Sequence, residues 1–302
     1  MKILLLGASG QVGWELQRSL APLGELIMLD RHGIELCGDL GNLPGLTATV
    51  QRVQPDIIVN AAAHTAVDKA ESEPELAHTL NALAPGVLAQ EAAKLGALLV
   101  HYSTDYVFDG SGTRPWLETD TPAPLNVYGQ SKLEGERLIQ AVCPNHLIFR
   151  TSWVYAARGG NFAKTMLRLA QERETLSVIN DQFGAPTGAD LLADISAHAI
   201  CQVLKNPKDV GLYHLVAGGE TSWHGYAQYV IELSQKTPSA IKIVTKTVTP
   251  VASSAFLTPA RRPHNSRLNT TKLQLTFGLH LPQWQQGVTR MLNEVLLQKS
   301  LN

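Results

Sequence analysis

The chain has 302 residues, a formal net charge of −1, and 44% hydrophobic and 17% charged residues. This length predicts one large domain with a smaller lobe, and the composition excludes a disordered or fibrous protein. The near-neutral charge gives no electrostatic basis for binding nucleic acid or an anionic membrane surface.

Three features predict a cytoplasmic location. Cys37, Cys143 and Cys201 are far apart in the sequence, which favours free thiols over disulfides or a zinc site. The opening apolar run at residues 2–6 is too short for a signal peptide. No segment approaches the roughly 20 apolar residues that are needed to span a bilayer.

The N-terminal segment has the pattern of a dinucleotide-binding βαβ unit. The apolar run at 2–6 leads into three glycines spaced as Gly-x-x-Gly-x-x-Gly, then a helical pattern, then a second apolar run that ends at Asp30. The glycines permit a tight turn that brings backbone N–H groups of the helix start close to a pyrophosphate. Asp30 favours NAD(H) by accepting hydrogen bonds from the ribose, whereas Arg31 suits the 2′-phosphate of NADP(H). We therefore expect a nicotinamide cofactor, NADH or NADPH.

The next two segments are expected to complete the cofactor side of the site. An apolar run at 57–63 ends in small residues, which would let a cofactor lie against the backbone there. Asp39 and Leu40, after the second predicted strand, are placed to line the adenine side. Residues 71–95 read as one long helix whose acidic residues form a solvated face.

A catalytic group is predicted from the next strand and helix. The apolar run at 98–108 passes through Thr104, where the carboxyl end of a strand would open onto a ligand crevice. Tyr128 and Lys132 follow at a spacing of four, which puts both side chains on one face of a helix. We expect Lys132 to lower the pKa of Tyr128, Tyr128 to donate a proton to a carbonyl oxygen, and Thr104 to hydrogen-bond that oxygen.

The second half of the chain is expected to bind the substrate. Alternating strand and helix patterns predict an α/β fold, a Rossmann-type doubly wound parallel sheet formed by residues 1–155 with later returns at about 175–215. Residues 156–302 are predicted to form mainly a smaller substrate-binding lobe, in which 252–266 is a long polar stretch. Within that stretch, Arg261 and Arg262 are candidates for binding phosphate.

With these residues in hand, the chain resembles the dTDP-4-dehydrorhamnose reductases, a family of extended short-chain dehydrogenases/reductases. The resemblance covers nearly the whole length. Beyond the glycine and Tyr-x-x-x-Lys motifs it rests on the stretches NAAAHTAVDKAE (60–71), YSTDYVF (102–108), RTSWVY (150–155), NDQFGAPT (180–187) and RRP (261–263).

The resemblance implies reduction of the C4 carbonyl of dTDP-4-dehydro-β-L-rhamnose by NAD(P)H. The product, dTDP-β-L-rhamnose, would be the end of that nucleotide sugar's synthesis, with lipopolysaccharide O-antigen as a destination. The resemblance also implies a homodimer with Mg²⁺ held between subunits by carboxylates, for which Glu15, Asp190 and Glu294 correspond here.

The predicted site residues from both lines of reasoning fall into three groups. The catalytic group is Thr104, Tyr128 and Lys132. The cofactor group is Gly7, Gly10, Gln11, Val12, Gly13, Asp30, Arg31, Asp39, Leu40, Ala62, Ala63, His64, Thr65, Tyr128 and Lys132. The substrate group is Tyr102, Thr104, Asp105, Trp153, Arg261 and Arg262.

Two other functions are compatible with the same fold. A nucleotide-sugar epimerase or 4,6-dehydratase would share the cofactor site, but a dehydratase should carry an acidic pair after its threonine, and here Asp105 is followed by Tyr106. A non-catalytic NADP-binding subunit, like the regulatory subunit of methionine adenosyltransferase, would need no catalytic group. The presence of Thr104, Tyr128 and Lys132 favours the enzyme.

Overall fold

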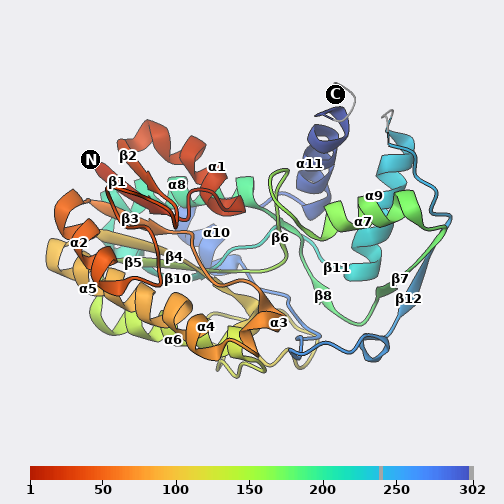
Figure 1. Cartoon of the computed structure of the whole chain (residues 1–302), viewed down its shortest axis with the longest axis horizontal. Coiled ribbons are helices and arrows are strands. Elements are labelled where there is room, and N and C mark those ends of the chain that lie inside the picture. The colour runs from red at the N-terminus through yellow and green to blue at the C-terminus, as the bar shows by residue number, and fades with distance from the viewer. Residues whose placement is uncertain (238–240, 299–302) are drawn as a thin grey trace.

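The computed structural model, which describes residues 1–237 and 241–298, is built around a parallel six-stranded sheet (Figure 1). The strand order is β10-β5-β4-β3-β1-β2, and each neighbouring pair is parallel. The strands are β1 (Lys2–Leu6), β2 (Glu25–Leu29), β3 (Ile57–Asn60), β4 (Leu98–Thr104), β5 (His146–Thr151) and β10 (Gly211–His214). This arrangement confirms the predicted doubly wound α/β fold.

Helices cover both faces of this sheet, as Figure 1 shows. One face packs against α1 (Gln11–Leu20) and α8 (Ala189–Lys205), and the other against α2 (Leu43–Val53), α5 (Ala84–Leu95) and α6 (Val127–Val142). A short helix, α10 (Thr271–Phe277), packs on β10 and α8. Because both faces are covered, every residue of β3 and β4 is buried, which explains why these strands read as continuous rather than alternating apolar runs.

A smaller lobe lies beside the sheet (Figure 1). Its helices are α7 (Phe162–Glu172), α9 (Trp223–Lys236) and α11 (Trp284–Gln298), which share a separate hydrophobic core. Its strands pair in twos: β7 (Thr175–Ile179) with β12 (Thr247–Val251), β8 (Phe183–Gly184) with β11 (Thr221–Ser222), and β6 (Val154–Tyr155) with β9 (Thr187–Gly188). Short 3₁₀ turns are formed by Ala21–Leu23, Asp105–Val107, Pro207–Asp209 and Ser253–Ala255.

The chain passes between the two lobes more than once. After residue 155 it enters the smaller lobe with α7 and β7, and it rejoins the sheet with α8 and β10 (Figure 1). The predicted boundary between the two lobes at residues 155 and 156 stays a prediction. Residues 299–302, which were assigned to the smaller lobe, lie outside the described residues.

The segment predicted as one helix over 71–95 is divided in the structure. It follows a short helix, α3 (Val67–Ala70), and consists of α4 (Pro74–His78), a π-helical turn (Thr79–Leu83) and α5. Pro85 has no N–H to donate to the carbonyl of Asn81, so the regular hydrogen-bond ladder cannot pass through this point. That carbonyl instead faces α6, where a Cβ added to Gly135 would lie 2.2 Å from the Asn81 oxygen. The distortion therefore brings α6 close to the π-helical turn.

Helix α6 is held to the sheet by a buried ion pair. Nε and Nη2 of Arg150, on β5, donate to the Glu136 carboxylate at 2.9 and 2.6 Å, and the two side chains are 4% and 1% exposed. The start of α6 is capped by Asn126, whose Oδ1 accepts from the Gly129 N–H at 2.8 Å. The ion pair therefore fixes α6 to β5, while the cap satisfies the first turn of the helix.

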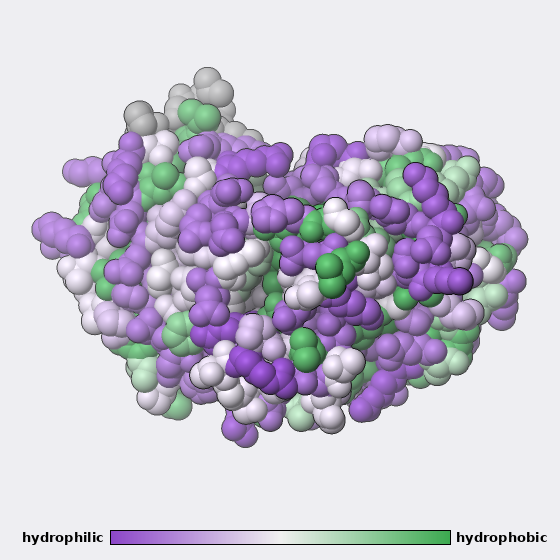
Figure 2. Space-filling view, turned by 180° about the vertical axis from the view of Figure 1, so that it is seen from behind, coloured by the Kyte–Doolittle hydropathy of each residue, from purple (hydrophilic) through white to green (hydrophobic). Residues whose placement is uncertain are grey.

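The surface seen in Figure 2 is mostly hydrophilic, with apolar side chains scattered over it, and it is indented between the two lobes. Among residues 1–237 and 241–298, no helix is both long enough and apolar enough to cross a membrane.

The ion pair predicts a large stability difference between two glutamates of α6. Glu136→Ala leaves the Arg150 charge buried and uncompensated, so we expect a loss of about 3–5 kcal/mol in the free energy of unfolding. The control is Glu134→Ala, which breaks an exposed 3.7 Å pair with Arg137 and should cost below about 1 kcal/mol. Urea unfolding of both variants measures the difference, and equal losses would contradict the anchoring role of Glu136.

Candidate active site

The glycine turn after β1 has the geometry of a phosphate-binding turn. Gly7 has a φ of +79°, and a Cβ on it would lie 2.7 Å from the Ala62 backbone nitrogen. A Cβ on Gly13 would lie 2.0 Å from the Gly7 carbonyl oxygen. Gly10 caps α1 without a side-chain hydrogen bond, so the first N–H groups of that helix stay available to an anion. The turn lies where the strand order reverses between β1 and β3, the usual dinucleotide position.

The residues predicted to meet adenosine lie after β2. Asp30 is half-buried and its Oδ1 accepts from the His32 N–H at 2.9 Å. Arg31 is exposed, with its Nε 3.6 Å from the Asp39 carboxylate, while Leu40 is buried in the core beneath them. The acid that favours NAD(H) and the cation that favours NADP(H) are therefore both present after β2.

The loop after β3 forms the other wall of the predicted cofactor site. Ala62 and Ala63 are partly exposed beside the glycine turn, and Thr65 is exposed. His64 is tied to the π-helical turn, since its N–H donates to the Asn81 Oδ1 at 2.8 Å and its carbonyl accepts from the Asn81 Nδ2 at 3.1 Å. The same Nδ2 lies 3.1 Å from the Ser131 hydroxyl of α6. Asn81 therefore joins the predicted cofactor loop to the helix that carries Tyr128 and Lys132.

The phenol of Tyr128 holds its proton more tightly than a phenol in water. Burial raises the pKa of Tyr128 to about 12, with hydrogen bonding by Thr104 lowering it and the nearby Asp105 carboxylate raising it. The phenol is therefore protonated at neutral pH. This net direction is opposite to the lowering expected from the Tyr-x-x-x-Lys spacing, because the loss of water around the phenol outweighs the stabilising groups. The Tyr106 ring packs edge-on against Tyr128, with 5.6 Å between centroids.

Lys132 is fully buried next to β4. Its Nζ lies 2.5 Å from the Tyr102 carbonyl oxygen and 3.0 Å from the His101 Nε2. Burial lowers the pKa of Lys132 to about 8, an effect that the Glu136 carboxylate opposes. Lys132 therefore exchanges its proton close to neutral pH, which suits a group that supports acid–base chemistry.

Thr104 and Asp105 lie together at the carboxyl end of β4. The Thr104 hydroxyl donates to the Asp105 Oδ1 at 3.1 Å and accepts from the Tyr106 N–H at 3.2 Å. Burial raises the pKa of Asp105 to about 7, with hydrogen bonding to Ser266 and Thr104 opposing the shift. The Asp105 Oδ2 is buried without a hydrogen-bond partner in the described part of the chain, which leaves one acceptor free beside the catalytic group.

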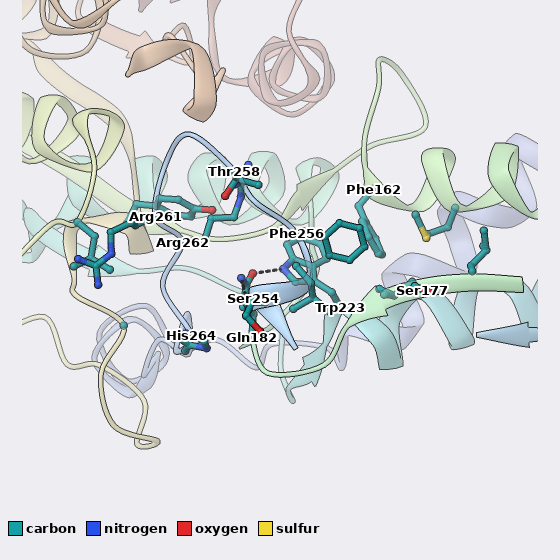
Figure 3. Close-up of a pocket in the computed structure, with 18 of the residues that line it drawn as sticks. Phe162, Ser177, Gln182, Trp223, Ser254, Phe256, Thr258, Arg261, Arg262 and His264 are labelled. Carbon is teal, nitrogen blue, oxygen red and sulfur yellow. Dashed lines mark hydrogen bonds between the residues drawn. The ribbon is translucent and has the colours of Figure 1, made fainter. Parts of the chain in front are cut away.

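A large cavity opens beside Tyr106 toward the smaller lobe. Its volume is about 1130 Å³, enough for a nucleotide sugar, and Figure 3 shows its lining. Phe162 and Trp223 form an aromatic wall, and the Trp223 Nε1 donates to the Gln182 Oε1 at 3.1 Å (Figure 3). Trp153 stacks on Trp223 with 3.6 Å between ring centroids, and it holds a positive φ of 49°, a conformation that costs energy for a residue with a Cβ.

The two predicted phosphate-binding arginines line the same cavity but differ in their contacts (Figure 3). The Arg262 Nη2 lies 2.7 Å from the Asp68 carboxylate, so its charge is already paired. Arg261 is exposed, and its backbone carbonyl accepts from the Asn126 Nδ2 at 2.7 Å. Within residues 1–237 and 241–298, no carboxylate pairs with the Arg261 guanidinium. Arg261 is thus the better placed of the two to bind an anion.

One predicted substrate residue is placed elsewhere. The Tyr102 ring belongs to the hydrophobic core, and its hydroxyl lies 2.6 Å from the Ser196 hydroxyl of α8. Side chains alternate along a strand, so Tyr102 points away from the face that carries His101 and Lys132. The predicted contact between the Tyr102 side chain and the substrate therefore has no support in the structure.

The sequence model of the family described as "RmlD substrate binding domain" matches residues 1–297. The chain belongs to this family. A dTDP-4-dehydrorhamnose reductase of Shigella flexneri is 61% identical over 295 residues, covering 98% of each chain. A dTDP-4-dehydrorhamnose reductase of Salmonella typhimurium is 62% identical over 295 residues, also covering 98% of each chain.

Solved structures related to the RmlD family have the same fold over almost the whole chain. A dTDP-4-dehydrorhamnose reductase of Clostridium acetobutylicum superposes with a TM-score of 0.88 at 37% identity, covering 99% of this chain and 100% of that one. A dTDP-4-dehydrorhamnose reductase of Bacillus anthracis, in complex with NADP, has a TM-score of 0.86 at 34% identity, covering 97% and 99%. The family resemblance seen in the sequence motifs is confirmed.

The three carboxylates predicted to bind Mg²⁺ lie near one another. Burial and the charges of Asp190 and Glu294 raise the pKa of Glu15, while Arg18 and Arg290 lower it. Asp190 is already paired with the Arg290 guanidinium at 3.2 Å. Among the described residues of this single chain, no group of three or more acidic, histidine or cysteine side chains has an arrangement that could hold a metal ion. The site was predicted between two subunits, and Mg²⁺ stays a prediction.

Several residues of this RmlD-family site were not found from the sequence. Asn81 and Trp223 lie outside the recognised motifs, His101 directly precedes one and Gln182 lies within another, and their contacts with the site form only in the folded chain. The proline at 85 was a signal for the π-helical turn that orients Asn81. We see no comparable local signal for Trp223.

The close approach of Gly7 to the loop after β3 predicts a selective loss of cofactor binding. Gly7→Ala places a Cβ within 2.7 Å of the Ala62 backbone, so the turn must open, and we expect NADPH affinity to fall by at least about tenfold. Gly96→Ala is the control, because Gly96 also has a positive φ (67°) but a Cβ there meets nothing within 4 Å. Fluorescence titration with NADPH compares the two, and equal affinities would rule out a cofactor role for the Gly7 turn.

Proposed function

We propose that this chain reduces the C4 carbonyl of dTDP-4-dehydro-β-L-rhamnose with NAD(P)H, the final step in the formation of dTDP-β-L-rhamnose. The observation that carries the proposal is the group Thr104, Tyr128 and Lys132, in which Tyr128 packs against Tyr106, a residue that lines a cavity large enough for a nucleotide sugar. Relatives named dTDP-4-dehydrorhamnose reductase, 61–62% identical over nearly the full chain, support the choice of substrate.

The chain's own residues account for the proton and the orientation of the carbonyl. Tyr128, protonated at neutral pH, donates its phenolic proton to the C4 oxygen. The Thr104 hydroxyl hydrogen-bonds the same oxygen and stabilises the negative charge that develops on it. When bound, the nicotinamide cofactor supplies the hydride to C4.

The residues around the glycine turn fit a nicotinamide dinucleotide. The uncapped start of α1 suits the pyrophosphate, Asp30 and Arg31 would meet the adenosine end, and Lys132 would hold the nicotinamide ribose. The solved relative with bound NADP supports a nicotinamide cofactor for this chain. Both Asp30 and Arg31 are present, so we propose use of NADPH and NADH.

The cavity lining fits the nucleotide end of the substrate. The aromatic wall of Phe162 and Trp223, with Trp153 stacked on Trp223, offers a flat face for a base or sugar ring, and Arg261 offers a cation for the diphosphate. Asp105 contributes a buried carboxyl beside the reacting carbon, where its free oxygen can hydrogen-bond a sugar hydroxyl.

The alternatives predict different chemistry at the same site. An epimerase would return its hydride to the sugar and consume no cofactor, and a dehydratase would need a second acid where Tyr106 stands. A regulatory subunit would bind NADP without turnover. The complete catalytic group favours a reductase over the regulatory subunit.

The same proposal extends to the setting of the enzyme. We propose a cytoplasmic homodimer whose product supplies rhamnose for lipopolysaccharide O-antigen, with the bacterial relatives and the three free cysteines as support. No step of the proposed reaction requires Mg²⁺.

The proposal predicts separate effects on turnover and on binding. Tyr128→Phe removes the proton donor while keeping the ring, so we expect turnover to fall by at least about 10²-fold and NADPH affinity to stay within about twofold. Cofactor oxidation is followed at 340 nm with enzymatically generated sugar, and the product is identified chromatographically. Unchanged turnover in the variant would refute Tyr128 as the donor.

The pair Asp30 and Arg31 predicts dual coenzyme use. We expect kcat/KM values for NADPH and NADH within about 100-fold of each other, since the carboxylate and the guanidinium favour different coenzymes. A preference beyond that ratio would contradict dual use. Arg31→Ala should then lower kcat/KM for NADPH more than for NADH.

A further inference from the structure

A chain of buried polar groups runs from β3 to the catalytic lysine. Asn60, His101 and Lys132 are each 1% exposed. Asn60 and His101 are directly paired on neighbouring strands, and the Asn60 Nδ2 lies 3.2 Å from the His101 Nδ1. The His101 Nε2 lies 3.0 Å from the Lys132 Nζ. Neither Asn60 nor His101 has a role in the reaction described above.

The donors and acceptors in this chain can be assigned from one end. The Ala62 backbone N–H, a donor only, lies 3.2 Å from the Asn60 side-chain oxygen, so the amide nitrogen of Asn60 must face His101. That nitrogen is also a donor only, so the His101 Nδ1 must be the unprotonated acceptor. A neutral His101 therefore carries its proton on Nε2, and this N–H points at the Lys132 Nζ.

The proton on the His101 Nε2 affects the protonation state of Lys132. The Nε2–H of His101 can donate to the lone pair of an uncharged amine, whereas an ammonium at the same place would oppose one donor to another. The Tyr102 carbonyl, 2.5 Å from Nζ, accepts from either form. Every polar group from Asn60 to Lys132 thus has a hydrogen-bond partner when Lys132 is neutral, and the contact between His101 and Lys132 is lost when Lys132 is charged.

We propose that His101, with its tautomer held by Asn60, is a positioning residue that weakens the hold of Lys132 on its proton. Lys132 is then able to release a proton within the working pH range, where a lysine in water stays charged. The tautomer does not depend on the identity of the substrate, and only the effect on the rate rests on the proposed function.

The other groups facing Lys132 are consistent with this role. On α6 itself, Glu136 attracts the ammonium, but its carboxylate is paired with Arg150 of β5. From β4, His101 is held uncharged, since burial and the Lys132 charge depress the pKa of His101 well below its usual range. From β3, Asn60 carries no charge. Burial of Lys132 lowers its pKa in the same direction as the hydrogen-bond chain.

The direct test is the proton position on His101 in the cofactor-free protein. With ¹⁵N-histidine labelling, NMR at pH 9 should show His101 protonated on Nε2, its signals assigned by their loss in His101→Gln. Asn60→Asp replaces the amide donor with an acceptor of the same shape, so the proton should move to Nδ1. A native protein with the proton on Nδ1 would overturn the proposal.

The second test is the pH profile of turnover. In Asn60→Asp and His101→Gln the group facing Lys132 becomes an acceptor, which stabilises the ammonium, so the fall of kcat at high pH should move upward by about one unit. The KM for the sugar should change less than kcat. His214→Gln is the control, since His214 is another fully buried histidine, on β10, that hydrogen-bonds the Trp116 carbonyl at 3.1 Å.

Each outcome of the pH-profile test decides whether Asn60 and His101 affect the deprotonation of Lys132. An upward shift in both variants, with the control profile unchanged, supports the positioning role. Loss of rate in both variants without a shift in the profile assigns Asn60 and His101 a purely structural role and overturns it. Failure of the native enzyme to reduce the sugar would remove the proposed function while leaving the NMR result to decide the tautomer.

Discussion

The attachment of α6 to the parallel sheet is the constraint on which the rest of the site depends. Two contacts of different kinds establish it: the buried Glu136–Arg150 ion pair and the Lys132 hydrogen bond to the Tyr102 carbonyl. Each is buried, so removing either partner leaves a polar group without water or a counterpart. The position of Tyr128 relative to Thr104 is a consequence of these two contacts.

Burial at this junction also determines the chemistry. The same exclusion of water raises the pKa of Tyr128 and lowers that of Lys132, so that the phenol stays protonated while the amine exchanges its proton near neutral pH. The phenol and the amine both have ordinary pKa values near 10, and burial thereby separates them into a protonated phenol and an amine that can lose its charge. The hydrogen-bond chain through His101 and Asn60 acts on the second of these.

The π-helical turn and the two-lobed arrangement link this junction to the ligands. Asn81 connects the loop beside the glycine turn to α6, so the predicted cofactor site and the catalytic helix are held in one hydrogen-bonded unit. The smaller lobe supplies Phe162, Gln182 and Trp223 to a cavity that begins at Tyr106. A substrate in that cavity would contact both lobes, with its reacting end toward the sheet.

The sequence alone determined the features that depend on local spacing. The buried runs of β1, β3 and β4, the glycine turn and the Tyr128–Lys132 pair all follow from periodicity and residue type within short windows, and so the fold was predictable. The family was recognised from the resemblance of its longer motifs, and the catalytic role of the pair stays a prediction. The tertiary structure decided what depends on burial and on distant pairing. Burial reversed the expected direction of the Tyr128 pKa, and packing placed the Tyr102 ring in the core. Asn60, His101 and Lys132 were joined across two strands and a helix. Such contacts join residues that are tens of positions apart in the sequence. A short sequence window therefore does not indicate which side chains will be buried against one another.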